Sequence, residues 1–288
     1  MTSPSAATSV PARASGTFAI AGEMSVYRLG FGAMRLPGVR DGPDSPSGAR
    51  AMLREAVRLG IDFIDTARAY GRSEELIADA LHPYPAGLVI ATKGGLRRGG
   101  HPDGRPERLR ADCEDSLRRL RLDTIDLWQL HRIDPEIPLE EQLGAIRELR
   151  DEGKIRFVGV SEVTLAELGR ARQLVDIATV QNRFNLGEQG ANDVLRACED
   201  DGIGFIPWAP IAMGDLLGSS AALARVAARH AATQAQIALA WLLQRSPVVL
   251  PIPGTGSVEH LRENVSAALI DLSESDLLAL ERDVEQPS

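Results

Sequence analysis

The sequence is poor in lysine and cysteine and contains no long apolar run. Of its 32 basic residues only Lys93 and Lys154 are lysines, so the other 30 are arginines. The two cysteines, Cys113 and Cys198, lie far apart in helical patterns, which excludes a disulfide framework and a cysteine metal site and favours buried thiols. No stretch approaches the roughly 18 apolar residues of a membrane span, so we expect no membrane partner.

The charge balance also argues against a nucleic-acid partner. The net charge is −8 and the pI about 5.3, and no run of basic residues stands out, so we expect no nucleic-acid partner. Residues 1–16 are small, polar and proline-containing, and they lack the apolar centre of a signal peptide. We therefore predict a disordered tail over 1–16 on a cytoplasmic protein. The sequence does not fix the oligomeric state, and a monomer is our expectation.

Short apolar runs alternate with longer helical patterns along the chain. Their nearly continuous apolar character is typical of parallel strands buried on both faces. Eight such alternations predict an α/β fold, a (β/α)8 TIM barrel formed by residues 17–288 as one domain. The predicted strands are residues 30–34, 63–66, 88–93, 125–131, 157–161, 179–182, 205–210 and 248–254.

Further elements surround this repeat. The residues flanking Glu23 and Met24 predict an N-terminal β-hairpin, and Ser73 is a candidate N-cap for the helix that follows it. Residues 211–247 have room for two helices, and 273–282 predict an extra C-terminal helix capped by Ser273. A doubly wound sheet is the rival fold, but its glycine-rich turn is poorly matched at 30–38, where Pro37 interrupts the helix.

Four polar residues stand at or just after predicted strand ends: Asp65, Tyr70, Lys93 and His131. The carboxyl ends of barrel strands meet at one rim, so we expect these side chains in one pocket. Such a set suits reduction of a carbonyl group, because hydride addition builds negative charge on oxygen and requires a proton donor. A nearby ammonium lowers the pKa of a phenol, and lysine suits that task better than arginine.

Each of these residues also has a simpler interpretation. Asp65 could cap a turn, Tyr70 could be a half-buried packing residue, Lys93 could reach solvent and His131 could be a loop histidine. The strand-end positions of all four, in a chain that otherwise uses arginine, favour the catalytic interpretation.

Several strings resemble the aldo-keto reductases over about residues 17–282. They are DTARAYG (65–71), LHR (130–132), VGVSE (158–162), VQN (180–182) and IPGTGSVEHLREN (252–264). LHRIDP and GVSE are similar to a branch with plant and bacterial carbonyl, perakine-type and pyridoxal reductases. The resemblance implies a barrel with a hairpin across its bottom, an extended NADPH at the C-terminal rim, and a small carbonyl substrate. It also implies Tyr70 as acid, supported by Asp65, Lys93 and His131.

The resemblance also implies a set of cofactor-binding residues. Ser161 and Gln181 would bind the nicotinamide carboxamide, and Glu263 and Asn264 the adenine. Trp208 would stack on the nicotinamide, unless it is an interior barrel tryptophan. The helix beginning near 257 has free N–H groups for a phosphate. The full set is Gly32, Met34, Ser161, Glu162, Gln181, Trp208, Ala209, Ile211, Gly254, Thr255, Gly256, Ser257, His260, Glu263 and Asn264.

Two departures from the family pattern affect these expectations. Glu162 stands where the family commonly has Asn. The 2′-phosphate pocket lacks its usual Lys or Arg and offers Thr255, Ser257 and His260, with Arg262 nearby. We therefore expect NADPH with a modest preference, and NADH remains possible.

The substrate and the activity itself leave alternatives open. Arg97 and Arg98, in the loop after Lys93, either favour an anionic substrate or are solvated. A cofactor-binding regulatory or sensor barrel with little turnover is the alternative to an enzyme, and the intact set of four residues favours the enzyme.

Overall fold

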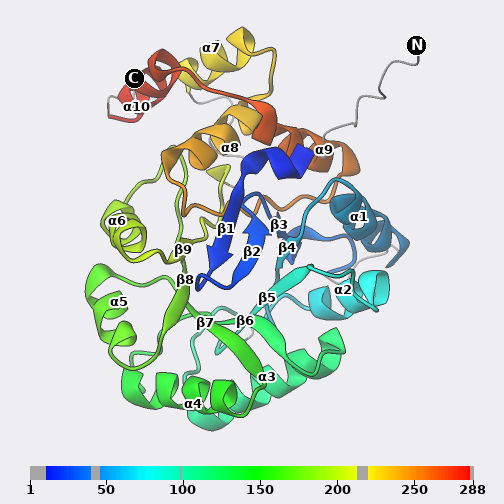
Figure 1. Ribbon diagram of the computed structural model, residues 1–288, viewed down its shortest axis with the longest axis vertical. Coiled ribbons are helices and arrows are strands. Elements are labelled where there is room, and N and C mark those ends of the chain that lie inside the picture. Colours follow the sequence, from blue (N-terminus) through cyan, green and yellow to red (C-terminus); the bar gives the residue numbers. More distant parts are fainter. Residues whose placement is uncertain (1–10, 40–45, 98, 213–219, 286–288) are drawn as a thin grey trace.

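A computed structural model describes residues 11–39, 46–97, 99–212 and 220–285. Its centre is a parallel sheet of seven strands in chain order, curled into a barrel and ringed by helices (Figure 1). The barrel strands are β3 (Phe31–Gly32), β4 (Phe63–Asp65), β5 (Val89–Gly94), β6 (Ile125–Leu130), β7 (Ile155–Ser161), β8 (Ile177–Gln181) and β9 (Gly204–Phe205).

An eighth extended segment, residues 248–254, closes the barrel between β9 and β3. On one side Leu250 N donates to Phe205 O at 2.8 Å, and on the other Gly30 N donates to Pro251 O at 2.9 Å. Pro251 and Pro253 have no N–H group, so the segment cannot form the regular ladder predicted for it and is not assigned as a strand. The predicted (β/α)8 barrel is confirmed, although β9 ends at Phe205, well before the predicted residue 210.

Two glycines permit this closure. A Cβ atom on Gly32 would lie 2.6 Å from Ile252 O, and one on Gly254 would lie 2.7 Å from Gly32 O. At these two positions the backbone of β3 lies so close to the segment 248–254 that a residue with a side chain does not fit.

The predicted hairpin is confirmed as β1 (Thr17–Ile20) and β2 (Met24–Tyr27). Its Ile20, Met24 and Val26 pack against Phe63 and Leu127 inside the barrel, so the hairpin covers the N-terminal end. The helices are α1 (Pro46–Arg58), α2 (Ser73–Leu81), α3 (Pro106–Leu120), α4 (Leu139–Asp151), α5 (Leu165–Arg172), α6 (Asn192–Asp201), α7 (Ala221–Arg229), α8 (Gln234–Arg245), α9 (Val258–Ser266) and α10 (Glu274–Glu285).

The helix predictions are mostly right. The two helices expected in 211–247 are α7 and α8, and Asp276 N donates to the predicted cap Ser273 at 3.2 Å. Ser73 is not an N-cap. It is the first residue of α2, and its hydroxyl instead donates to Ala33 O at 3.1 Å and accepts from Thr66 Oγ1 at 2.8 Å.

The predicted disordered tail is wrong for its last part. Residues 1–10 lie outside the described residues, but Pro11–Ser15 forms a 3-10 helix with Ala12 fully buried. The Ser15 hydroxyl donates to Ala12 O at 2.7 Å, and Arg28 Nε donates to Ser15 O at 2.7 Å. The contact with Arg28, together with the burial of Ala12, orders a segment whose composition alone indicates disorder.

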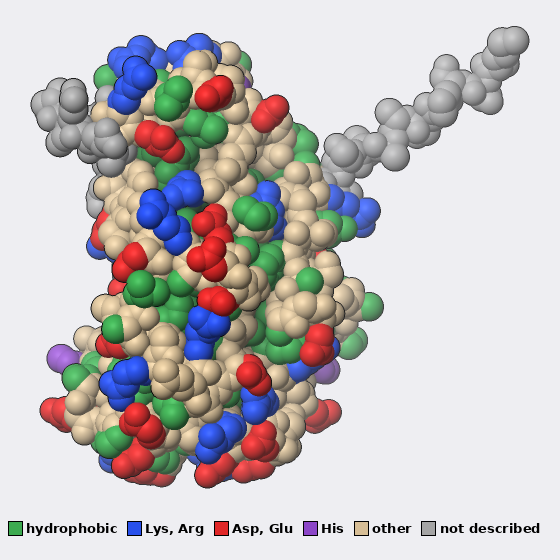
Figure 2. All heavy atoms as spheres, turned by 60° about the vertical axis from the view of Figure 1, so that its left-hand side comes forward, with side chains coloured by type: hydrophobic (Ala, Val, Ile, Leu, Met, Phe, Trp, Pro, Cys, Tyr) green, Lys and Arg blue, Asp and Glu red, His purple; other side chains and the backbone are tan. Residues whose placement is uncertain are grey.

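The face of the molecule in Figure 2 mixes charges of both signs. Basic and acidic side chains alternate on the face shown in Figure 2 and form no large patch of one sign. Cys113 and Cys198 are buried and unpaired, as predicted. Among the described helices, none has the length and apolar character needed to cross a membrane.

Candidate active site

A cavity of about 490 Å³ opens where the barrel strands end. Three of the four predicted catalytic residues line it, namely Asp65, Tyr70 and His131. Lys93 lies beneath them and is fully buried. The structure thus brings all four together. Of the predicted cofactor residues, eight also line the cavity: Gly32, Met34, Ser161, Gln181, Trp208, Ala209, Ile211 and Gly254.

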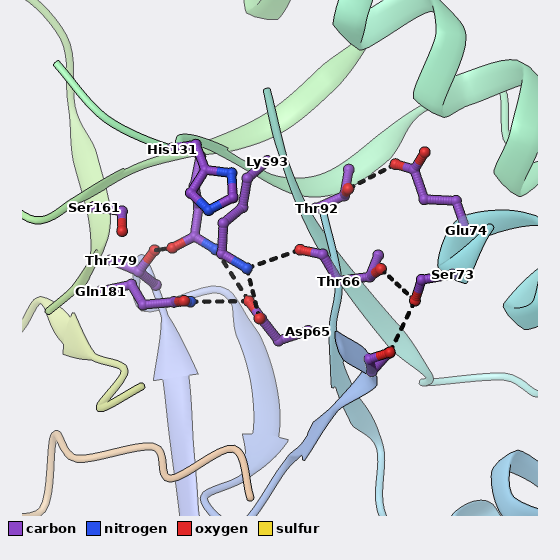
Figure 3. A network of polar contacts seen from close by, with 12 residues as sticks. Asp65, Thr66, Ser73, Glu74, Thr92, Lys93, His131, Ser161, Thr179 and Gln181 are labelled. Atoms are coloured by element: carbon purple, nitrogen blue, oxygen red, sulfur yellow. Dashed lines mark hydrogen bonds and ion pairs between the residues drawn. The ribbon is translucent and has the colours of Figure 1, made fainter. Parts of the chain in front are cut away.

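Lys93 and Asp65 form a buried ion pair at the floor of this cavity (Figure 3). Lys93 Nζ donates to Asp65 Oδ1 at 2.6 Å and to Thr66 O at 2.8 Å. Burial acts to lower the pKa of Lys93, but Asp65 and Tyr70 outweigh it and the pKa is raised, so the side chain is an ammonium ion. Burying two charges is costly unless hydrogen bonds compensate it. Here Lys93 Nζ donates twice, and both oxygens of Asp65 accept hydrogen bonds.

Tyr70 lies next to this ammonium group. Lys93 Nζ is 5.1 Å from the centroid of its ring, and the His131 ring meets it edge-on at 5.8 Å. Burial raises the pKa of the phenol above its usual 10, and Lys93 acts in the opposite direction. The expectation of a lowered pKa is therefore wrong in sign, because burial is the larger effect. Tyr70 consequently keeps its proton at neutral pH.

The loop that carries Tyr70 is fixed by backbone contacts. Arg68 N donates to Lys93 O, and Tyr70 N donates to Ala67 O, each at 2.9 Å. Ser73 N donates to Tyr70 O at 2.9 Å. Thr66 also donates to Ser73, as Figure 3 shows, and Ser73 donates to Ala33 O. Together these bonds hold the loop between β4 and α2 over the buried ion pair.

His131 follows β6 directly, and its N–H donates to Gly94 O at 2.9 Å. Burial lowers its pKa well below 6.5, and Lys93 and Arg132 add to that effect. The imidazole is therefore neutral. Its Nδ1 has no hydrogen-bond partner among the described residues.

The second oxygen of Asp65 contacts two amides inside the barrel. Gln181 Nε2 donates to Asp65 Oδ2 at 2.9 Å and Gln129 Nε2 at 3.3 Å. A Cβ atom on Gly159 would lie 2.8 Å from Gln129 Cγ, so this glycine makes room for the Gln129 side chain. Gln129 was missed in the sequence. The sequence does contain a signal for it. Gln129 is a polar amide within an apolar strand, and it stands two residues before His131, hence on the same side of the strand.

Trp208 lies in the loop after β9 and lines the cavity, and Glu162 and Arg183 contact its indole ring. Its Nε1 donates to Glu162 Oε1, which also accepts from Arg183 N at 2.7 Å, and the Arg183 guanidinium lies 5.3 Å from the indole centroid. Glu162 itself does not line the cavity. Its carboxylate orients Trp208, and its predicted cofactor contact stays a prediction.

The predicted phosphate and adenine residues lie beyond the cavity wall: Thr255, Gly256, Ser257, His260, Glu263 and Asn264. Ser257 caps α9 by accepting from His260 N at 3.4 Å. Arg262 is engaged elsewhere, because its Nε forms an ion pair with Glu55 Oε1 at 2.7 Å. Arg35, which was not predicted, lines the cavity and lies close to Gly256. The described residues include no cluster of His, Cys, Asp or Glu able to hold a metal ion.

Comparison with known proteins gives a consistent result. Residues 28–283 match the model of the Aldo/keto reductase family. An uncharacterized oxidoreductase of Schizosaccharomyces pombe is 48% identical over 281 residues, which cover 95% of this chain and 91% of that protein. Pyridoxine 4-dehydrogenase of Escherichia coli is 40% identical, covering 93% of this chain and 98% of that protein. An aldo-keto reductase from Klebsiella pneumoniae, solved with NADPH, is 29% identical with a TM-score of 0.82, covering 94% of this chain and 95% of that one.

Proposed function

The chain belongs to the aldo/keto reductase family, and on that premise we propose that it reduces an aldehyde or ketone to an alcohol with NADPH. The observation that carries the proposal is the cluster of Tyr70, His131 and the Lys93–Asp65 ion pair at the floor of one cavity. NADPH is the cofactor of choice because a similar reductase was solved with it.

The residues present fit a nicotinamide at one side of this cavity. Ser161 Oγ accepts from Arg132 at 3.2 Å, which leaves its proton free to donate to the oxygen of a carboxamide. Gln181 uses its N–H on Asp65, which leaves its carbonyl oxygen for the carboxamide N–H groups. Trp208 offers an aromatic face beside them. Bound there, the cofactor would supply a hydride for the substrate carbonyl carbon.

Tyr70 would then protonate the carbonyl oxygen. It keeps its proton until negative charge builds on that oxygen, and it donates a hydrogen bond throughout. The Lys93 ammonium stabilises the phenolate left behind, and Asp65 holds Lys93 in place. Because His131 is neutral, it can position the substrate carbonyl without placing a second positive charge beside Lys93. General acid assistance of this kind typically contributes about 10²–10⁴ in rate.

The alternative, a cofactor-binding sensor barrel with little turnover, is separated by a direct assay. NADPH oxidation should be measured with a panel of aldehydes that includes pyridoxal, since one relative is pyridoxine 4-dehydrogenase. Turnover that depends on the aldehyde supports the proposal. Tight NADPH binding with no aldehyde-dependent turnover would favour the sensor.

A further inference from the structure

Three arginines line the cavity, and two of them, Arg97 and Arg132, follow the strands that lead to predicted catalytic residues. Arg97 follows β5 and Arg132 follows β6, the neighbouring strands that also lead to Lys93 and His131. The predicted cofactor residues instead follow β3 and β7 to β9 or belong to the segment after 252. Arg97 and Arg132 therefore flank the part of the cavity that would receive the substrate.

Arg97 is anchored at its base and free at its end. Its backbone N–H donates to His101 O at 2.8 Å, and its Nε donates to Asp103 Oδ2 at 2.8 Å. Its terminal nitrogens donate to none of the described residues, and 56% of the side chain is exposed. Asp103 is shared with Arg105, which also lies 3.6 Å from Glu107 Oε1, so Asp103 does not serve Arg97 alone.

Arg132 is held in a similar way. Its Nη1 donates to His131 O at 2.9 Å and to Ser161 Oγ at 3.2 Å. Its Nη2 lies 4.0 Å from Glu162 Oε2, too far for a hydrogen bond, and a third of the side chain is exposed. Glu162 already accepts hydrogen bonds from Trp208 and Arg183. Arg132 thus keeps N–H groups available beside the predicted catalytic histidine.

The charges on the cavity wall are one-sided. Among the described residues that line it, Asp65 is the only acidic one and is paired with Lys93, whereas Arg35, Arg97 and Arg132 contribute three guanidinium groups. The chain as a whole carries a net charge of −8, so this wall does not reflect the general composition. The backbone of Arg35 lies beside Gly256, a predicted cofactor residue, whereas Arg97 and Arg132 follow the strands that lead to Lys93 and His131.

We propose that Arg97 and Arg132 bind an anionic group of the substrate, so that the enzyme prefers carbonyl compounds that carry a carboxylate. The guanidinium fork matches a carboxylate in charge and geometry. This inference rests on the proposed reaction and adds the substrate class to it.

A matched pair of aldehydes tests the preference. The full chain with NADPH is assayed on 4-carboxybenzaldehyde and 4-methylbenzaldehyde, which have similar shapes and differ in charge. We expect kcat/KM to favour the carboxylate by about tenfold or more, as for a hydrogen bond between charged groups. Added salt should shrink the preference, because one arginine is largely exposed.

Variants assign the preference to residues. Arg97→Gln and Arg132→Gln should each lower the ratio of kcat/KM for the two aldehydes by about tenfold. Arg110→Gln is the control, because Arg110 lies on α3, pairs with Glu148 and Glu152 and does not line the cavity. The Kd for NADPH is measured for each variant by fluorescence quenching.

The outcomes are distinct. Equal turnover of both aldehydes, or a ratio that neither variant changes, overturns the inference while leaving the reaction intact. Equal loss for both aldehydes together with weaker NADPH binding in both variants shows that these arginines serve the cofactor site, and it too overturns the inference. Failure to turn over either aldehyde contradicts the proposed reaction and with it the inference.

Discussion

Gln181 donates a hydrogen bond from its Nε2 to Asp65 Oδ2 at 2.9 Å. The other oxygen of the same carboxylate accepts from Lys93. One buried carboxylate therefore contacts both a residue proposed to bind the cofactor and the lysine proposed to support the proton donor. Asp65 therefore links the proposed cofactor site to Lys93, the residue proposed to support the proton donor Tyr70.

This link predicts different effects for the two amides on Asp65. Gln181→Leu should weaken NADPH binding and lower kcat, because it removes the contact to Asp65 and the proposed contact to the cofactor. Gln129→Leu removes the inner contact to Asp65 and the 3.4 Å hydrogen bond that Gln129 accepts from Thr179, but no proposed cofactor contact. It should therefore lower kcat by roughly 2–10-fold, with little change in the Kd for NADPH. Fluorescence titration and steady-state kinetics measure both. Equal loss of NADPH affinity in the two variants would contradict the division of roles.

Lys93→Arg should abolish most activity although it keeps the charge. The Lys93 side chain is fully buried and bonds to Asp65 and Thr66 as a compact ammonium, and the larger planar guanidinium does not fit that position. We expect kcat to fall by about 100-fold or more. Lys154→Arg is the matched control, because the only other lysine is a surface residue paired with Glu114 and Glu152. Near-normal activity of Lys93→Arg would show that a positive charge alone suffices.

Acid should destabilise the fold through His131. Its pKa in the folded protein is well below 6.5, whereas the unfolded chain binds the proton near that pH. The unfolded state then holds more protons, so the free energy of unfolding falls as the pH drops through about 6.5. His131→Asn should flatten this slope between about pH 7 and 5, measured by urea unfolding. The exposed His101→Asn is the control, and an unchanged slope in the His131 variant would contradict the prediction.

The preference for NADPH over NADH should be modest. Arg262 pairs with Glu55, which leaves the α9 N-terminus, Thr255 and exposed His260 for a 2′-phosphate. We expect a ratio of Kd values of about tenfold or less, measured by fluorescence quenching. A ratio above about a thousandfold, or no preference at all, would show that other residues meet the phosphate.

The sequence predicted the barrel and the grouping of four residues because both follow from local patterns. Apolar runs locate strands, and parallel strands deliver their ends to one rim, so Asp65, Lys93 and His131 had to converge. What the sequence did not reveal depends on distant contacts. The 3-10 helix at Pro11–Ser15 is held by Arg28, and the barrel closure depends on backbone approach at Gly32.

The same limit applies inside the site. The pKa of Tyr70 was expected to fall because its neighbour Lys93 is visible in the sequence, whereas the larger effect of burial is not. Gln129 and Arg132 were missed because their roles depend on which side chains they meet across the barrel. Glu162 departs from the family pattern, and the structure shows its contact with Trp208.

The central claim is that Tyr70 is the proton donor, and Tyr70→Phe tests it most directly. The substitution removes the phenolic O–H and leaves the ring beside Lys93 and His131. We predict that kcat for aldehyde reduction falls by about 100-fold or more while the Kd for NADPH stays within about twofold of the wild type. Retention of more than about a tenth of the wild-type kcat, with the cofactor still bound, would contradict the account.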